Sequence, residues 1–117
     1  MNKDELCGRT KKFELDMIIL IDELPRTLSG RAVGGQLVRC ATSVAANYRA
    51  ACRSRSRNEF IAKIGVVEEE ADESAFWLEI IIEGNLLPKQ REQSQLNEAI
   101  ELTKIMASSR KTAKGAA

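Results

Sequence analysis

Residues 36–58, QLVRCATSVAANYRAACRSRSRN, decide the fold of this 117-residue chain. Apolar side chains recur there at alternating intervals of four and three residues, the spacing that places side chains on one face of an α-helix. The pattern predicts a helix over about residues 35–53, followed by a turn rich in arginine. The apolar stripe consists of Leu37, Ala41, Val44, Tyr48 and Ala51.

The same helix carries a second stripe of small and polar residues beside the apolar one. A helix with two such faces is expected to be buried on more than one side. Two interpretations of the polar side chains stay open: they line a pocket, or they form hydrogen bonds where helices meet, and we favour the second. The stripe consists of Gln36, Cys40, Ser43 and Asn47.

Three further segments show the helical rhythm, and we expect helices over about residues 10–24, 57–83 and 88–108. Residues 27–35 contain three glycines and are expected to form a loop, and residues 109–117 a frayed basic tail. Short connections make neighbouring helices antiparallel. The whole chain, 1–117, is therefore predicted to be one all-α domain, an antiparallel up-down-up-down four-helix bundle.

The expected inner faces and boundaries follow from residue type. Pro25 ends the first helix, because proline disfavours helix at the preceding residue. Ser56 and Glu59 have the spacing of a capping box, and Gly84 is a helix stop. The inner faces consist of Phe13, Met17, Leu20 and Leu24 in the first helix, Phe60, Ile64, Val67, Ala71, Ser74, Leu78 and Ile81 in the third, and Leu96, Ala99, Ile100, Thr103 and Met106 in the fourth.

Composition argues against most enzyme and membrane classes. Histidine is absent, which removes the commonest general base and the commonest transition-metal ligand. Cys7, Cys40 and Cys52 form no CxxC pair, and we expect reduced, buried thiols. The polar N-terminus has no signal peptide, and the apolar run 17–21 is too short to span a bilayer, so we expect a cytoplasmic protein with no membrane partner.

Charge is unevenly distributed although the net charge is only +1. Residues 25–58 contain seven arginines and no acid, whereas residues 59–84 contain eight acids and one lysine. If the turn between the two helices centres near residue 55, Arg39 lies level with residue 71. We therefore expect Arg39 to form a partly buried structural ion pair with Glu70 or Glu73, within the chain or between chains.

Other chemistry was weighed and not favoured. The acids at 68–70, 72 and 73 have no histidine beside them for a di-iron site and no ligand loop for calcium. Gly30, Gly34 and Gly35 are not followed by the Gly-Lys-[Ser/Thr] of a phosphate-binding loop. The sequence predicts no catalytic residue, no metal, no cofactor and no small-molecule substrate.

Residues 36–83 carry a set of motif positions at characteristic spacing. They are Gln36, Arg39, Cys40, Ser43, Val44 and Asn47, then Arg55, Ser56, Glu59 and Phe60, then Glu70, Ala71, Glu73, Trp77, Leu78 and Glu79. With these positions the chain resembles a bacterial four-helix-bundle family encoded in intervening sequences of 23S ribosomal RNA genes. The resemblance implies an antiparallel four-helix bundle, often a ring-like homopentamer, without established activity. A related branch serves as basic, nucleic-acid-binding accessory protein to reverse transcriptases of diversity-generating retroelements.

Two functions from different classes follow. The first is a non-enzymatic, self-assembling interaction or scaffold protein, in which the helices at 35–53 and 57–83 carry the interface. Trp77 lies one position off the main stripe, so it is read as a subunit-interface anchor, with burial inside the chain as the alternative. The second is a nucleic-acid-binding accessory protein, in which Tyr48 offers a stacking ring for RNA or DNA and phosphates are bound by Arg49, Arg53, Arg55 and Arg57.

Overall fold

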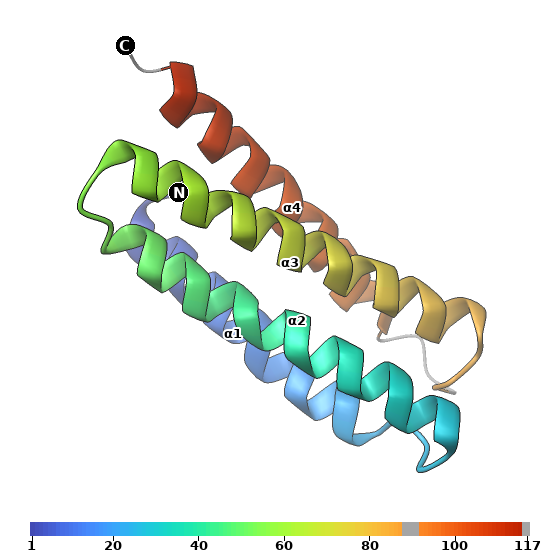
Figure 1. Cartoon of the computed structure of the whole chain (residues 1–117). Coiled ribbons are helices and arrows are strands. Elements are labelled where there is room, and N and C mark those ends of the chain that lie inside the picture. Colours follow the sequence, from blue (N-terminus) through green and yellow to red (C-terminus); the bar gives the residue numbers. More distant parts are fainter. Residues whose placement is uncertain (88–91, 116–117) are drawn as a thin grey trace.

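The computed structural model describes residues 1–87 and 92–115, and within these ranges it contains four helices and no strand. The all-α prediction is therefore confirmed. In Figure 1 the chain runs from one end of the molecule to the other in α1, returns in α2, and repeats this path in α3 and α4. The helices are α1 (Lys3–Asp22), α2 (Leu28–Cys52), α3 (Arg57–Glu83) and α4 (Glu92–Gly115).

Helix α1 begins seven residues earlier than predicted, because a capping box starts it at Lys3. Asn2 Oδ1 accepts a hydrogen bond from the Glu5 backbone N–H at 2.8 Å, and the Glu5 side chain accepts from the Asn2 backbone at 3.4 Å. The Asn-x-x-Glu pattern was the signal for this start. Thr10, expected near the helix start, is instead buried within it and donates its hydroxyl proton to a backbone carbonyl one turn before.

The loop predicted over residues 27–35 is wrong, because α2 already begins at Leu28 with Thr27 as its N-cap. Thr27 Oγ1 accepts from the Gly30 backbone N–H at 3.1 Å. Glycine disfavours helix by about 1 kcal/mol per residue, but tertiary packing outweighs this preference here. A Cβ at Gly30 would lie 2.0 Å from the Pro25 carbonyl oxygen, so the close turn between α1 and α2 requires glycine.

Helix α3 has the predicted bounds, although its cap differs in detail. Ser56 Oγ accepts from the Glu59 backbone N–H at 3.1 Å, as a capping serine should. The Glu59 carboxylate accepts from the backbone of Arg55, the residue before the cap, rather than from Ser56. At the other end Gly84 caps the helix, and Asn85 takes the left-handed conformation with φ of 52°.

Helix α4 is longer at its C-terminus than predicted. The start predicted at residue 88 lies outside the described residues, and the described part of the helix begins at Glu92. Residues 109–115 are helical rather than frayed, and Arg110 forms an ion pair of 2.8 Å with Glu68 of α3. Ala99, Leu102 and Met106 are buried, whereas Ile100 is 38% exposed and so does not belong to the inner face.

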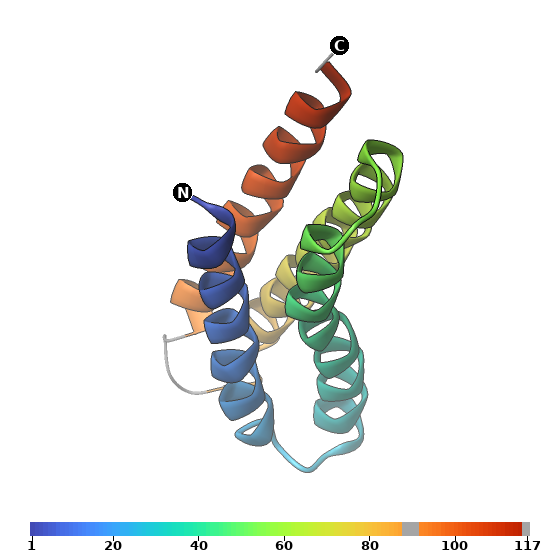
Figure 2. The same cartoon turned by 90° about the vertical axis from the view of Figure 1, so that its left-hand side faces the viewer.

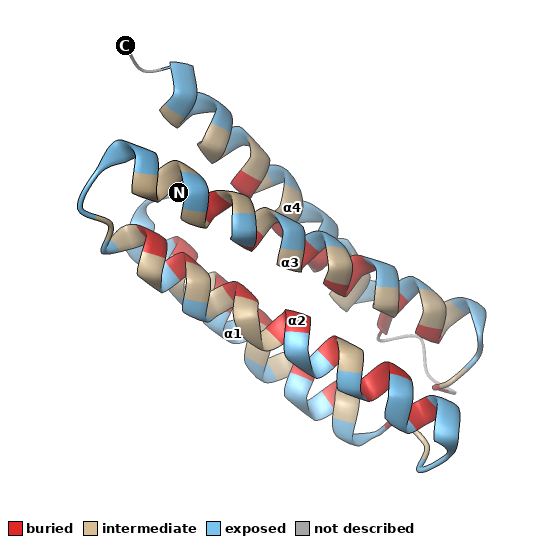
Figure 3. Ribbon diagram, viewed as in Figure 1, coloured by how far each residue is buried: buried red, intermediate tan, exposed pale blue. Residues whose placement is uncertain are grey.

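The core runs along the axis between the four helices, and buried positions face inward in Figure 3. It is built from aliphatic side chains, Phe13 and Tyr48, with Thr10 and Ser74 as buried polar residues. The Ser74 hydroxyl lies 2.8 Å from the Glu70 carbonyl and 3.4 Å from Cys40 Sγ. Figure 2 shows that α4 extends past the N-terminus of α1, so these two helices share a shorter contact than the other neighbouring pairs.

Candidate functional site

The predicted arginine cluster lies at one end of the bundle, on the last turn of α2, the following turn and the first residue of α3. Arg49, Arg53, Arg55 and Arg57 are all exposed. The end of α2 suits cations, because the partial negative charge of the helix C-terminus attracts them. Arg53 caps the helix through its backbone N–H, so its side chain remains on the surface.

Tertiary structure adds further cations to this end. Figure 1 places the N-terminus of α1, the α2–α3 turn and the C-terminal part of α4 together. We call this half of the molecule, residues 1–12, 41–70 and 104–115, the basic end. It contains 13 lysines and arginines against six acids, whereas the other described residues contain three arginines and 11 acids. The bundle is therefore strongly polarised along its length.

The accessible aromatic ring at the basic end is that of Phe60 rather than that of Tyr48. Tyr48 is 3% exposed, so the prediction that its ring is available for stacking is wrong. Burial raises the pKa of the Tyr48 hydroxyl far above its usual value. Phe60 is half-buried, its ring lies 5.7 Å from the Lys3 ammonium, and it borders a depression of about 390 Å³ that Arg57 also lines.

Four of the residues expected to be structural meet on the surface between α2 and α3. Arg39 donates to the Gln36 side chain and lies 4.0 Å from Glu73 Oε2. The Trp77 indole N–H donates to the same Glu73 oxygen at 3.2 Å. The Arg39 and Glu73 side chains are 68% and 40% exposed, so their ion pair contributes little to stability and is not the partly buried pair that we expected.

The other residues of the polar stripe bond within their own helix. Ser43 Oγ donates to the Arg39 carbonyl, and Asn47 Nδ2 donates to the Ser43 carbonyl, both at 2.8 Å. For Ser43 and Asn47, the prediction of hydrogen bonds between helices is therefore wrong. Glu70, the alternative partner for Arg39, accepts from Ser74 through its backbone carbonyl. The side chains of Ser43 and Asn47 are half-buried.

Among the residues that the structure describes, nothing points to a catalytic site. Burial raises the pKa of the Cys7 and Cys40 thiols, which lowers the fraction of reactive thiolate. Cys40 is buried as expected, but Cys7 and Cys52 are only half-buried. Residues 1–87 and 92–115 hold no group of three or more cysteine or acidic side chains placed to bind a metal ion, and none of their helices is long and apolar enough to cross a membrane.

Large apolar residues are exposed on α1, α2 and α3 at positions that the sequence patterns did not single out. Leu15 and Ile19 are each 55% exposed and Ile18 is 39% exposed, all on the outer side of α1. Val38 of α2 is 38% exposed and Phe76 of α3 is 50% exposed. The signal in the sequence was the continuous apolar run 17–21, because a helix with a single buried face cannot hide five consecutive apolar side chains.

Comparison with known proteins supports this description of the fold. The family model for 23S rRNA-intervening sequence proteins matches residues 3–108. No curated protein matches the chain. A crystal structure of a protein of unknown function from the S23 ribosomal protein family of Bacteroides thetaiotaomicron superposes with a TM-score of 0.85 at 27% identity, covering 95% of this chain and 99% of that one. With a family match over most of its length, the chain belongs to the 23S rRNA-intervening sequence protein family.

Proposed function

We propose that this protein is a cytoplasmic, non-enzymatic interaction or scaffold protein that assembles with copies of itself as antiparallel four-helix bundles. The observation that carries the proposal is the apolar outer side of α1. Leu15, Ile18 and Ile19 project away from the core while Phe13 and Met17 on the same helix are buried. Removing such apolar area from water is the main driving force of protein association.

The experiment that tests self-assembly is light scattering coupled to size-exclusion chromatography. We expect a mass that is a multiple of 13.0 kDa at concentrations up to about 100 µM. A ring of five copies is the size that the family resemblance implies. Ile19→Arg should shift the mass towards that of a single chain, because a buried unpaired charge strongly disfavours an interface. Lys104→Arg, a change at an exposed site of α4, serves as the control. A single-chain mass throughout this range would refute the proposal.

A second function, binding of RNA or DNA, is favoured by the polarisation of the bundle. The basic end collects 13 cations, including the predicted four arginines and three residues of α4, Arg110, Lys111 and Lys114. Each phosphate that such residues neutralise releases counterions, which gives affinity without reading the base sequence. This candidate therefore predicts binding that falls steeply with salt and differs little between sequences.

Fluorescence polarisation with single-stranded and duplex RNA and DNA tests this second function at about 50 and about 200 mM salt. Arg53→Ala combined with Arg55→Ala should weaken binding at low salt and flatten its salt dependence. Arg26→Ala combined with Arg31→Ala removes the same charge from the opposite end and should have little effect. Binding without salt dependence, or equal effects of both pairs, would exclude the basic end as the nucleic-acid surface.

A further inference from the structure

Phe76 is a large aromatic side chain on the outer side of α3, and it is half exposed. Its ring packs edge-on against Trp77, with 5.0 Å between ring centroids and 76° between ring planes, so a neighbouring side chain restrains it. Exposed acids surround it on the same helix: Glu69, Asp72, Glu79 and Glu83. An oriented aromatic residue within a rim of charged groups is the usual anatomy of a protein interface.

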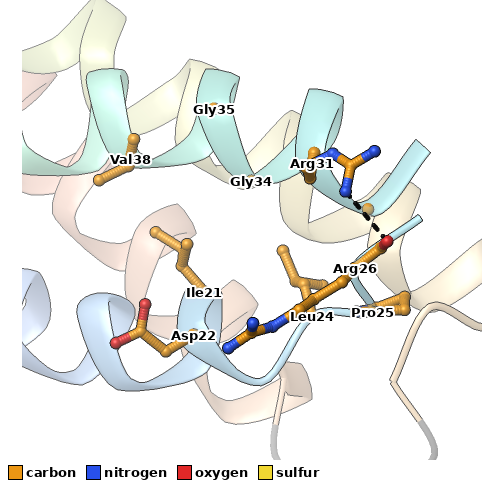
Figure 4. A pocket seen from close by; sticks show the side chains of 10 residues that line it. Ile21, Asp22, Leu24, Pro25, Arg26, Arg31, Gly34, Gly35 and Val38 are labelled. Atoms are coloured by element: carbon orange, nitrogen blue, oxygen red, sulfur yellow. Dashed lines mark hydrogen bonds between the residues drawn. The ribbon is translucent and has the colours of Figure 1, made fainter. Parts of the chain in front are cut away.

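A depression that could receive such a side chain lies between α1 and α2, and we call it the α1–α2 groove. It holds an open depression of about 870 Å³ lined by Ile21 of α1 and by Gly34, Gly35 and Val38 of α2. Figure 4 shows Val38 and Ile21 at the edge of this depression, with no side chain from either glycine to fill it. Gly35 is exposed and a Cβ built there would meet nothing within 4 Å, so α2 is open to an approaching side chain at this position.

The charges of the two surfaces are also complementary. The α2 side of the groove has no acidic residue, because none occurs between Glu23 and Glu59, and the groove as a whole is lined by Arg26 and Arg31 against one acid, Asp22 of α1. The α2 side carries exposed arginines instead, and Arg31 and Arg39 lie at the height of the acids around Phe76. The acids around Phe76 would face these arginines if α3 of one copy lay along α2 of another. Opposite potentials across an interface steer association and fix its orientation.

The two surfaces lie at the same height along the bundle. Ser74 of α3 contacts Cys40 of α2, with Oγ and Sγ 3.4 Å apart, so these residues are level. Because α2 and α3 run in opposite directions in Figure 1, Phe76 lies level with Val38, two residues or about 3 Å further along each helix. When copies are related by rotation about an axis parallel to the bundle, surfaces at equal height meet. A closed ring built by such a rotation therefore allows this contact.

We propose that Phe76 of one copy inserts into the α1–α2 groove of a second copy, between Ile21 and Val38 and over Gly35. The inference rests on the self-assembly proposed above and names its contact. The two surfaces lie on different helices, so the interface is heterologous: each copy offers Phe76 to one neighbour and its groove to the other. Such an interface builds a ring when the rotation closes.

Charge substitutions on either side of the contact test the proposal. Phe76→Glu and Val38→Glu should each raise the dissociation constant of the assembly by at least about tenfold, the effect expected of a central interface residue. Ile100→Glu is the matched control, because Ile100 of α4 and Val38 are both 38% exposed. Circular dichroism of each variant should show an intact helical fold.

Cysteine cross-linking tests the geometry in a Cys7→Ser, Cys52→Ser background. Gly35→Cys and Glu79→Cys in one chain, which lie at the same height and leave Phe76 in place, should give a ladder of covalent oligomers under mild oxidation, whereas a mixture of the two single variants should stop at covalent dimers. An assembled wild-type protein whose mass is unchanged by both Glu substitutions, and which gives no ladder, would overturn this contact while leaving self-assembly intact. A wild-type protein that stays a single chain would remove self-assembly itself, and the contact with it.

Discussion

Gly30 offers a sharp test of the tertiary packing, because its Cα lies against the backbone of the α1–α2 turn. In Gly30→Ala the new methyl group would lie 2.0 Å from the Pro25 carbonyl oxygen and 3.0 Å from the Pro25 carbonyl carbon. Both Pro25 atoms belong to the backbone, so no side-chain rotation can relieve the clash. The first turn of α2 or the end of α1 must move by more than an ångström.

The expected cost follows from two opposing terms. Overpacking against the backbone costs about 3 kcal/mol, and alanine in place of a helical glycine returns about 1 kcal/mol. Gly30→Ala should therefore lower the free energy of unfolding by about 2 kcal/mol, or the melting temperature by about 8 °C for a domain of this size. The φ angle of Gly30 is negative, so the loss would be steric rather than conformational.

Gly8→Ala is the matched control for this experiment. Gly8 is also helical, but a Cβ there would meet nothing within 4 Å, so the substitution should raise the free energy of unfolding by about 0.5–1 kcal/mol. Gly8 is preferred to Gly35, which lies in the proposed interface. Urea unfolding at one fixed protein concentration measures both variants. Equal or higher stability of Gly30→Ala would show that the turn is looser than described and refute the reasoning.

Three further predictions concern single contacts. Arg9 and Glu98, which form two hydrogen bonds of 2.7 and 2.8 Å between α1 and α4, should show a coupling of about 1 kcal/mol in a double-mutant cycle with alanine; additive effects would contradict the pair. Burial raises the pKa of the Glu14 carboxyl, so the ionised form destabilises the fold, and Glu14→Gln should stabilise the protein by about 1 kcal/mol at neutral pH. That gain should shrink as the pH falls below the folded-state pKa and vanish only below the unfolded value of 4.5, where both states are protonated, and thermal melts across pH check it. Asn85→Gly should raise the free energy of unfolding and Asn85→Ala lower it, by about 0.5 kcal/mol each in urea unfolding, since Asn85 has a positive φ; effects of the opposite sign would count against a left-handed cap.

Prediction of the helices from the sequence was best where one local signal decides the structure. The stripe of α3 and the capping Ser56 placed that helix correctly, because side-chain periodicity and a cap act within a few residues. It failed at residues 27–35, where three glycines disfavour helix locally but two of them, Gly30 and Gly34, pack closely against the end of α1 and the residues that follow it. The helix preference of a residue is worth less than its packing against a neighbouring helix.

The candidate surfaces were predictable to differing degrees. The four arginines at the α2–α3 turn stand out in the sequence, because they occur in a segment without acids. Their grouping with Arg110, Lys111 and Lys114 depends on the length and direction of α4, which no local pattern gives. Tyr48 shows the opposite case, since a tyrosine beside a basic cluster suggested stacking, whereas its ring is part of the core.

The sequence by itself determined that the chain folds into helices, because apolar spacing, caps and the proline and glycine stops act over single turns. It also determined that arginines and acids occupy separate segments. The tertiary structure decided where those charges meet, because the direction of each helix carries distant segments to the same end. It likewise decided that Phe76 and Val38 remain on the surface at one height, since exposure depends on which neighbouring helices cover a residue and not on its own type.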